Sequence, residues 1–349
     1  MTPERTTRHC LDPWRHVEIG ALGEISPCCL HPPLGHIDTA SVPGLLERDS
    51  DAFRQLRESL LTGNLTESCR ACHIRPLAPL KIQRQAVRSA GGVVRGALLD
   101  AGTLTSMRID VTRDCNLRCV YCAVSQKGYV GGEMPAEVFN AALKLIQADA
   151  GGLRIDLNGH GETTSHPDWL RMARAAIESG ASVTLLSNFA RPFDADEIRV
   201  LASMSVIQIS LDTTDDALLR RLRRRVSLGT ILRNLHLVRM HACKANLKPE
   251  WAISCGVYDK SVASLRDLAW FAVTAGFDSV TFWNLVGYPD VRDPGAMRVK
   301  PIADLPEDEQ RSAVAALRDA VRILEDHGVN AEVAGDFVDW PSGRWSQTG

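Results

Sequence analysis

The sequence predicts an α/β protein in which six strand-helix units with a parallel sheet follow a small cysteine-rich domain. Three observations lead to this prediction. Between residues 103 and 285, short apolar runs alternate with amphipathic helical stretches, the pattern of parallel strands joined by crossover helices. Several of the apolar runs end in polar residues or glycines. Seven of the ten cysteines fall into two clusters, one before the alternating region and one at its start.

Composition sets the broad class of the protein. The 349 residues are 45% hydrophobic and 23% charged, which is ordinary for a globular chain with a sizeable core. A net charge of −2 gives no indication of general nucleic-acid binding. No run of about 18 apolar residues is present, and the N-terminus lacks a signal-peptide core. We therefore expect a cytoplasmic protein with no membrane or nucleic-acid partner, whose cysteines are metal ligands or catalytic thiols more than disulfides.

The first cysteine cluster begins with a predicted β-hairpin. Cys10 precedes a stretch in which apolar residues alternate up to a turn at Gly23, and Cys28 and Cys29 follow that turn. Glycine suits such a turn because it accepts positive φ angles without strain. The hairpin would bring Cys10 close to Cys28 or Cys29, and the sequence alone leaves open which of the latter two is a ligand.

A helix and a second pair of cysteines complete this cluster. Residues 51–63 have helical periodicity and end at a glycine, so we expect one short helix before the pair Cys69 and Cys72. Four thiolates fill the coordination of a metal site completely. A structural zinc and a four-iron cluster both accept such a set.

The second cysteine cluster is the central feature of the chain. Residues 109–122 read IDVTRDCNLRCVYC and place Cys115, Cys119 and Cys122 directly after a strand-like run. Three thiolates on one loop can bind three irons of a cubane cluster and leave the fourth open for chemistry. Soft thiolates also bind zinc or copper(I), so a zinc knuckle or three structural cysteines are the alternative interpretation.

The spacing Cys-x3-Cys-x-Tyr-Cys resembles the signature loop of the radical S-adenosylmethionine (SAM) enzymes. The resemblance implies a partial (β/α)6 TIM-like barrel and a [4Fe-4S] cluster whose open iron is chelated by SAM. It further implies that an electron from a donor such as flavodoxin or ferredoxin cleaves SAM to a 5′-deoxyadenosyl radical, which takes a hydrogen atom from the substrate. The metal ligands of this cluster would be Cys115, Cys119 and Cys122.

The N-terminal cysteine pattern is similar to the auxiliary-cluster segment of the SPASM and twitch subfamilies of these enzymes. In those subfamilies the segment usually follows the catalytic domain, whereas here it precedes it. The similarity implies an auxiliary [4Fe-4S] cluster, with Gly-x4-Cys spacing favouring Cys28 over Cys29. The expected ligands are Cys10, Cys28, Cys69 and Cys72.

The same resemblance assigns SAM-binding roles to polar residues at strand ends. Helices are expected at 135–148 and 167–179. A Gly-Gly-Glu-like motif holds the amino group of SAM in this family, and here its first glycine is replaced by His160. Simple turn caps or a solvated helix face are the alternatives for several of these side chains. The expected cofactor-binding residues are Tyr121, Gly161, Glu162, Ser187, Asn188, Ser210 and Arg225, with Arg223 as second choice for the arginine.

Three further residues are candidates for the reaction itself. His160 beside the cofactor is suited to contact substrate or to act as an acid or base near neutral pH, unless a backbone carbonyl satisfies it. Cys255, on the strand-like run 251–258, would be the hydrogen-atom donor if the enzyme were an epimerase, and Tyr258 competes for that role. A small buried hydrophobe is the alternative interpretation of Cys255.

We therefore expect four regions and a radical SAM enzyme. Hydrogen abstraction from a small polar metabolite, such as a sugar or glycosyl-nucleoside in antibiotic biosynthesis, with decarboxylation or dehydrogenation as outcome, is the first hypothesis. The alternatives are a ribosomal-peptide maturase, an epimerase, and a non-catalytic iron-sulfur or zinc protein. The regions are an auxiliary-cluster domain at 1–80, a linker at 81–102, the barrel at 103–290, and an extension at 291–349 with an amphipathic helix at 307–327.

Overall fold

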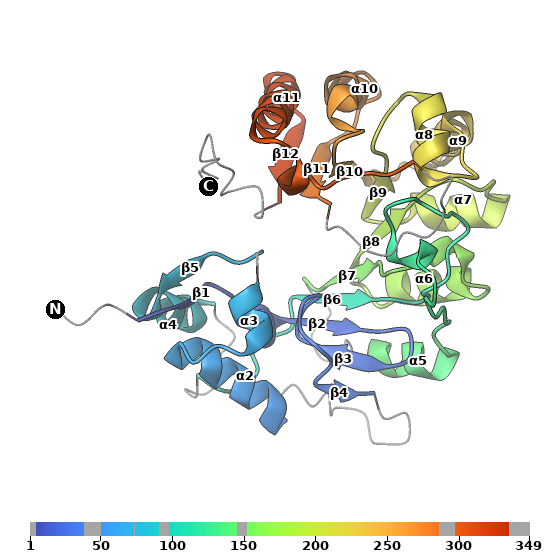
Figure 1. Cartoon of the computed structure of the whole chain (residues 1–349). Coiled ribbons are helices and arrows are strands. Elements are labelled where there is room, and N and C mark those ends of the chain that lie inside the picture. The colour runs from blue at the N-terminus through green and yellow to red at the C-terminus, as the bar shows by residue number, and fades with distance from the viewer. Residues whose placement is uncertain are drawn as a thin grey trace. The chain divides into compact units, whose positions relative to one another are not determined.

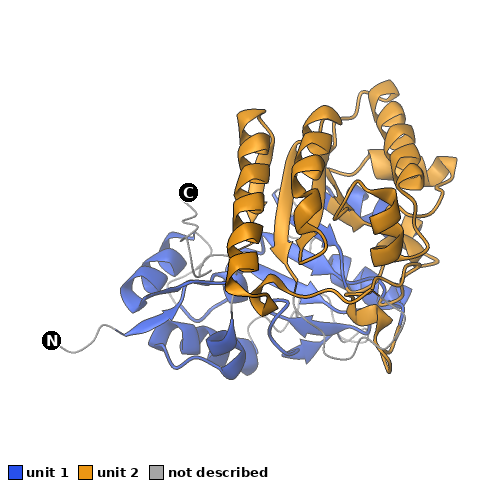
Figure 2. Cartoon of the chain, turned by 45° about the horizontal axis from the view of Figure 1, so that its top comes forward, with its two compact units in different colours: residues 1–112, 132–159, 171–183 blue, residues 113–131, 160–170, 184–349 orange. Residues whose placement is uncertain are grey.

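The computed structural model describes residues 5–37, 50–72, 74–90, 98–144, 152–285 and 297–334. The chain divides into two compact units, which Figure 2 colours separately. Unit 1 comprises residues 1–112, 132–159 and 171–183, and unit 2 comprises residues 113–131, 160–170 and 184–349. The candidate auxiliary cysteines belong to unit 1, and the loop with the other three clustered cysteines belongs to unit 2.

Unit 1 contains the predicted hairpin (Figure 1). Strands β2 and β3 are antiparallel, with Ile19 opposite Ile25, and Gly23 in the turn has a φ angle of 93°. The strands of this unit are β1 (Thr6–Arg8), β2 (His16–Ile19), β3 (Glu24–Ser26), β4 (Gly35–His36), β5 (Leu77–Pro79), β6 (Ser106–Ile109) and β7 (Arg154–Leu157).

The hairpin is joined to the first strand of the alternating region. β2 pairs in parallel with β6, from His16 opposite Ser106 to Ile19 opposite Ile109, and β6 pairs in parallel with β7. β4 pairs with β3, while β1 and β5 form a separate antiparallel pair. The cysteine-bearing hairpin is therefore an extension of the parallel sheet, even though it precedes that sheet in sequence.

Helices α1 to α4 belong to the cysteine-rich part of unit 1, and α5 follows β6 later in the chain. Ser50 caps α2 by accepting a hydrogen bond from the backbone N–H of Phe53. Gly63 ends the helix with a φ angle of 78°, and this terminal glycine is the one that the sequence predicts. α4 lies within the predicted linker, and its Val87 belongs to a buried cluster with Trp14 and Leu60. The helices are α1 (Asp12–Arg15), α2 (Asp51–Thr62), α3 (Glu67–Ala71), α4 (Leu80–Ser89) and α5 (Ala136–Lys144).

Unit 2 is built on a parallel sheet in the order β12-β11-β10-β9-β8. Strands and helices alternate along the chain, as the sequence predicts. The strands are β8 (Ser182–Ser187), β9 (Val206–Ser210), β10 (Glu250–Val257), β11 (Ser279–Asn284) and β12 (Asn330–Val333). The helices of this unit are α7 (Ala195–Ala202), α8 (Asp216–Arg223), α9 (Leu228–Lys244), α10 (Leu265–Thr274) and α11 (Glu307–Asp326), while most of α6 (Trp169–Glu178) belongs to unit 1.

The two faces of this sheet differ in character. On one face Ile207, Ile253, Val280 and Phe282 are all fully buried. On the other face the side chains are half-buried along β8, β9 and β11, so burial alternates residue by residue. The apolar face forms the core, and the other face is available to position functional groups.

The long helices agree with the predictions to within about two residues. α6 falls inside the predicted 167–179, and α11 matches 307–327. α5 begins one residue after the predicted start at 135, and residues 145–148 of that prediction lie outside the described residues.

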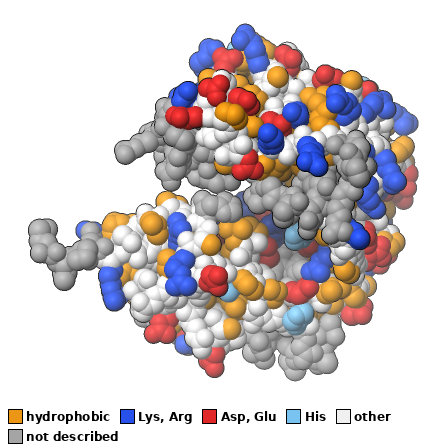
Figure 3. Space-filling view, viewed as in Figure 1, with side chains coloured by type: hydrophobic (Ala, Val, Ile, Leu, Met, Phe, Trp, Pro, Cys, Tyr) orange, Lys and Arg blue, Asp and Glu red, His pale blue; other side chains and the backbone are white. Residues whose placement is uncertain are grey.

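No helix among the described residues is long and apolar enough to cross a membrane. On the face in Figure 3, Lys and Arg are interspersed with Asp and Glu.

Candidate functional site

The cysteine loop of unit 2 is fixed by backbone hydrogen bonds. The Val120 N–H donates to the Leu222 carbonyl at 2.8 Å, and the Arg118 N–H donates to the Arg223 carbonyl at 3.4 Å. Both carbonyls lie at the end of α8. The Leu117 N–H donates to the Cys115 sulfur at 3.4 Å. The loop is thus tied to α8 along the stretch that carries its cysteines.

The donor set of this loop fits an iron-sulfur cluster. Cys115, Cys119 and Cys122 are half-buried free thiols, and burial raises the pKa of Cys115 to about 11. Cluster binding must therefore displace its proton, which soft metals do readily. Among the described residues, no three His, Cys, Asp or Glu side chains converge on a point where a single metal ion would sit. Three thiols and backbone N–H donors to sulfur are what a cluster with one open iron uses.

Glu162 organises the strand end next to the loop. Its carboxylate is 3% exposed and accepts hydrogen bonds from the Ser187 hydroxyl and the Asn188 N–H, both at 2.7 Å. It also accepts from the hydroxyl and the N–H of Thr164. The Glu162 N–H itself donates to the Asp114 carbonyl, just before Cys115. Glu162, Ser187 and Asn188, three residues predicted to bind SAM, therefore share one hydrogen-bonded group.

Asn188 connects this group to the cysteine loop. Its amide nitrogen donates to Asn116 Oδ1 at 2.8 Å and lies 3.8 Å from the Cys115 sulfur. The following residue, Phe189, has a positive φ angle of 53°, a conformation that is strained for a bulky side chain. Asn234 stabilises it by donating to the Phe189 carbonyl at 2.9 Å. Strained backbone of this kind is common where a chain positions functional groups.

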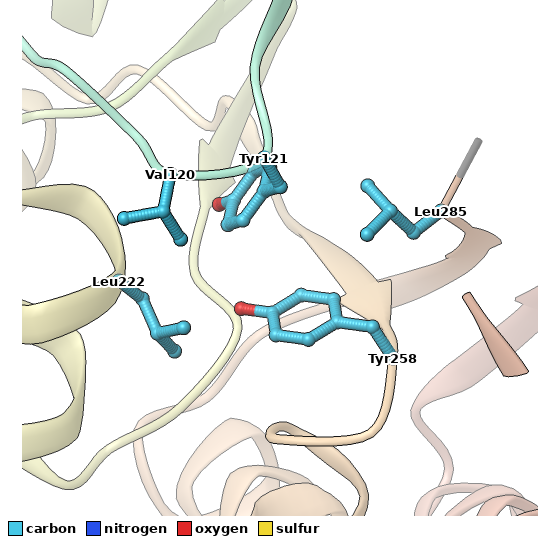
Figure 4. Close-up of a cluster of buried hydrophobic side chains, with 5 residues drawn as sticks. All are labelled: Val120, Tyr121, Leu222, Tyr258 and Leu285. Atoms are coloured by element: carbon cyan, nitrogen blue, oxygen red, sulfur yellow. The ribbon is translucent and has the colours of Figure 1, made fainter. Parts of the chain in front are cut away.

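A second buried group surrounds Asp212, and Figure 4 draws two of its members, Tyr121 and Tyr258. The Asp212 carboxylate is fully buried and accepts from the Tyr121 hydroxyl at 2.5 Å and the Tyr258 hydroxyl at 3.1 Å. In Figure 4 both tyrosine hydroxyls point the same way, beside Leu222. Arg223 donates two hydrogen bonds to the Asp212 carboxylate, at 2.8 and 3.0 Å. The Gly256 N–H donates a further hydrogen bond to the same carboxylate at 3.0 Å.

This group links the sheet to the cysteine loop, because Tyr121 stands between Cys119 and Cys122. Burial alone would raise the pKa of Asp212, but the Arg223 guanidinium and the hydrogen bonds outweigh it and lower that pKa. Asp212 is therefore ionised in the folded protein, and the Arg223 guanidinium forms an ion pair with it. The pair fixes the aromatic residue of the loop.

The predicted arginine, Arg225, lies elsewhere. Its side chain is exposed, beyond the end of α8, and both Arg224 and Arg225 have positive φ angles, of 54° and 50°. Arg223, the second choice, is 5% exposed and pairs with Asp212. The structure thus places Arg225 at the surface, and brings Arg223 to the cysteine loop.

The other predicted residues fall into two environments. His160 is exposed, and Gly161 and Ser210 are half-buried. Tyr258 belongs to the Asp212 group. Cys255 is fully buried opposite Phe282, on the apolar face of the sheet, and burial raises its pKa well above the ordinary value.

The auxiliary cysteines of unit 1 meet in one cavity of about 220 Å³. That is far more than the roughly 10–15 Å³ that one water needs. Burial raises the pKa of Cys28 to about 12, while hydrogen bonds from the Leu30 and His31 backbone favour its thiolate. Cys29 is the most exposed cysteine at this cavity. The donor set fits a fully ligated cluster; the thiols that line the cavity are Cys10, Cys28, Cys29, Cys69 and Cys72.

Two polar side chains that sequence reasoning missed hold these ligands in place. Gln83 of α4 is fully buried; it accepts from the Cys10 N–H at 3.1 Å and donates to the Cys10 carbonyl at 2.5 Å. Arg8 donates to the carbonyls of Cys69, Arg70 and Arg75. The signal for Gln83 was its place in line with Val87, four residues on, in an amphipathic stretch.

We expect Cys28→Ala to lose the auxiliary cluster and Cys29→Ala to keep it, because only Cys28 is both half-buried and supported by backbone donors. Iron content of the reconstituted protein should fall from about eight to about four atoms in Cys28→Ala alone. Loss of iron in Cys29→Ala with full loading of Cys28→Ala would reverse the assignment.

Two family models match different parts of the chain. The radical SAM superfamily model matches residues 109–268, and the model of an iron-sulfur cluster-binding domain of the SPASM type matches residues 10–73. The first match includes the cysteine loop, Glu162 and Asp212. The second includes the four candidate auxiliary ligands. The cofactors that these families imply are [4Fe-4S] clusters and SAM.

Curated relatives match the chain over part of their length. A GTP 3′,8-cyclase of Saccharophagus degradans is 27% identical over 179 residues, which is 50% of this chain and 52% of that protein. The tungsten-containing aldehyde ferredoxin oxidoreductase cofactor-modifying protein of Pyrococcus furiosus is 25% identical over 186 residues, 51% of each. The chain thus spans about half the length of these relatives.

Solved structures share the fold. Streptococcus suis SuiB bound to S-adenosylmethionine superposes with a TM-score of 0.53 at 16% identity, over 86% of this chain and 64% of that chain. Native anSMEcpe with bound AdoMet gives 0.51 at 17% identity, over 65% of this chain and 64% of that one. These matches confirm the predicted fold class, a partial (β/α)6 TIM-like barrel with a small N-terminal cysteine-rich domain. The chain thus carries a radical SAM domain at residues 109–268 and, ahead of it, a SPASM-type iron-sulfur cluster-binding segment at residues 10–73.

Proposed function

We propose that this protein cleaves SAM reductively and removes a hydrogen atom from a carbon of a small polar metabolite of the sugar or glycosyl-nucleoside type. The observation that carries the proposal is that, within unit 2, the group of Glu162, Ser187 and Asn188 adjoins the cysteine loop where Asn188 approaches Cys115. One group supplies thiolates for a cluster with an open iron. The other supplies hydroxyl and amide groups beside it.

The residues of the chain have distinct roles in this proposal. Cys115, Cys119 and Cys122 would hold the cluster, and Ser187 and Asn188 would contact SAM, kept in place by Glu162. Asp212 and Arg223 position Tyr121 rather than touch the substrate. When bound, the cluster and SAM supply one-electron cleavage of the sulfonium and a carbon radical that takes the hydrogen atom. A flavodoxin or ferredoxin is the proposed electron donor.

Two observations bear on the substrate and outcome. The curated relatives include GTP 3′,8-cyclases, proteins named for a nucleotide substrate. Cys255 is fully buried on the apolar face of the sheet. This placement favours decarboxylation or dehydrogenation, as in natural-product biosynthesis, over epimerisation with Cys255 as hydrogen-atom donor.

The test is anaerobic incubation of the reconstituted, dithionite-reduced protein with SAM. We expect 5′-deoxyadenosine and methionine in equal amounts, measured by liquid chromatography and mass spectrometry. With a substrate deuterated at the attacked carbon, deuterium should appear in 5′-deoxyadenosine. An intact SAM pool in the presence of protein carrying about eight irons would overturn the proposal.

A further inference from the structure

The half-buried face of the unit 2 sheet carries mostly polar side chains, and the role assigned to it below rests on the proposed function. Strand register places Gln208 and Ser210 of β9, Ser254 of β10, and Thr281 and Trp283 of β11 on this one face. All five side chains are half-buried. We call them the polar face. Inside a parallel barrel such positions are ordinarily filled by branched apolar side chains, so this composition is unusual.

We propose that the polar face binds an uncharged, polyhydroxylated ring, the sugar of a glycoside or nucleoside without phosphate. The hydroxyls of Ser254 and Thr281 and the carboxamide of Gln208 each offer both a donor and an acceptor, which matches the hydroxyl groups of a sugar. The indole of Trp283 offers an apolar surface against which a sugar or base can pack. The combination of hydroxyl and carboxamide groups with one aromatic surface is what indicates a sugar or nucleoside as the ligand.

The absence of basic side chains limits the ligand class. Along β8 to β12 the positions on this face carry no Lys, Arg or His. The acidic residues on it are Glu250 and Glu332, which accept hydrogen bonds from Ser279 and Thr281. Phosphate recognition relies on Arg, Lys or helix N-termini, so a phosphorylated ligand is disfavoured here.

The polar face is pre-organised at its end nearest the carboxyl ends of the strands. The Trp283 Nε1–H donates to the Ser254 hydroxyl at 3.1 Å. A Cβ atom at Gly256 would lie 2.8 Å from the Trp283 ring, so the absence of a side chain at this position lets the indole lie against β10. Closer to the amino ends of the strands, the Gln208 amide nitrogen and the Thr281 hydroxyl are 3.5 Å apart.

The end of the polar face that carries Trp283 adjoins the cysteine loop. The Trp283 ring meets Tyr121 edge-on at 6.4 Å between centroids, and Tyr121 stands between two cluster cysteines. Ser210 and Trp283 also lie at the carboxyl ends of their strands, the edge where barrels of this kind place their chemistry. A ring bound on Ser254, Thr281 and Trp283 is therefore close to the site of hydrogen abstraction.

The experiment is isothermal titration of the anaerobic holoenzyme, loaded with SAM, with uridine, adenosine and methyl β-glucoside. We expect at least one of them to bind. Trp283→Leu and Thr281→Val should each weaken that binding about tenfold. Gly256→Ala, which keeps the indole but displaces it, should weaken binding similarly. Trp270→Phe, at an exposed tryptophan of α10, is the matched control and should change nothing.

Several outcomes would overturn the inference. These are no binding of the uncharged compounds, binding that Trp283→Leu and Thr281→Val leave unchanged, and GTP or a mixed decapeptide pool binding tighter than every uncharged compound. The measurements distinguish a failure of the polar face from a failure of the proposed function. Formation of 5′-deoxyadenosine without ligand binding refutes only the polar face, whereas ligand binding without SAM cleavage refutes only the proposed function.

Discussion

Asp212→Asn is expected to destabilise the protein by about 3–5 kcal/mol, because it leaves the buried Arg223 guanidinium without a counter-charge. The substitution keeps the shape of the side chain, so the effect is electrostatic. It also weakens the hydrogen bonds that hold Tyr121 and Tyr258. We expect a fall of several degrees in the melting temperature, measured by anaerobic calorimetry of the reconstituted protein.

The control for this prediction is an exposed ion pair in the same unit. Glu307→Gln on α11 breaks the contact with Arg311, whose side chain is 50% exposed, and should cost well under 1 kcal/mol. The double variant Asp212→Asn with Arg223→Met removes both charges and should recover part of the loss. Equal melting temperatures for Asp212→Asn and the wild type would show that the pair does not hold the loop.

The pH dependence gives an independent check. Because Arg223 lowers the pKa of Asp212 in the folded state, the contribution of Asp212 is fully present above the ordinary Asp pKa of about 3.9. It is lost as the pH falls through the lower, folded-state pKa. The stability difference between the wild type and Asp212→Asn should therefore be constant from pH 8 to 5 and shrink only in stronger acid.

Local patterns predicted the elements of this chain well. The serine cap and the terminal glycine of the helix at Asp51–Thr62 are residue types that mark helix ends. Gly23 likewise marks the hairpin turn. What local patterns do not contain is the partner of each strand. The parallel pairing of β2 with β6 joins residues about 90 positions apart, and it depends on packing that no local window records.

The choice among the arginines shows where sequence reasoning fails in the site. The run from Arg220 to Arg225 offers five similar side chains. Arg223 follows Leu219 by four residues, on the buried stripe of α8, whereas Arg225 lies past the helix end. The periodicity thus contained a signal for Arg223. That its partner is Asp212, and not a ligand, depends on the tertiary fold alone.

The polar face illustrates the same limit in another form. Ser254 and Cys255 are neighbours in sequence, and alternation predicts only that they point to opposite faces. The same alternation groups Cys255 with the apolar Ile253 and Val257, so it indicates which face is the core but not which side chains lie beside Ser254. Pairing with Phe282 buries Cys255, while Ser254 pairs with Thr281. The strand partner decided which residue was free for function.

The triple variant Cys115→Ala, Cys119→Ala, Cys122→Ala is expected to abolish SAM cleavage entirely while leaving the auxiliary cluster in place. Without loop thiolates no cluster with an open iron can form, and the ligands in unit 1 are untouched. Iron content should fall from about eight to about four atoms per chain. The 5′-deoxyadenosine signal should drop to background, which chromatography measures directly.

The matched control is Cys243→Ala, at an exposed cysteine of α9 that belongs to neither cluster. It should retain all the iron and full SAM cleavage, which separates loss of a ligand from general damage by cysteine removal. Because four thiolates leave no open iron, the auxiliary cluster has no vacant position at which SAM would bind. Residual SAM cleavage in the triple variant would therefore mean that the reactive cluster sits in unit 1, and the roles assigned to the two cysteine sets would have to be exchanged.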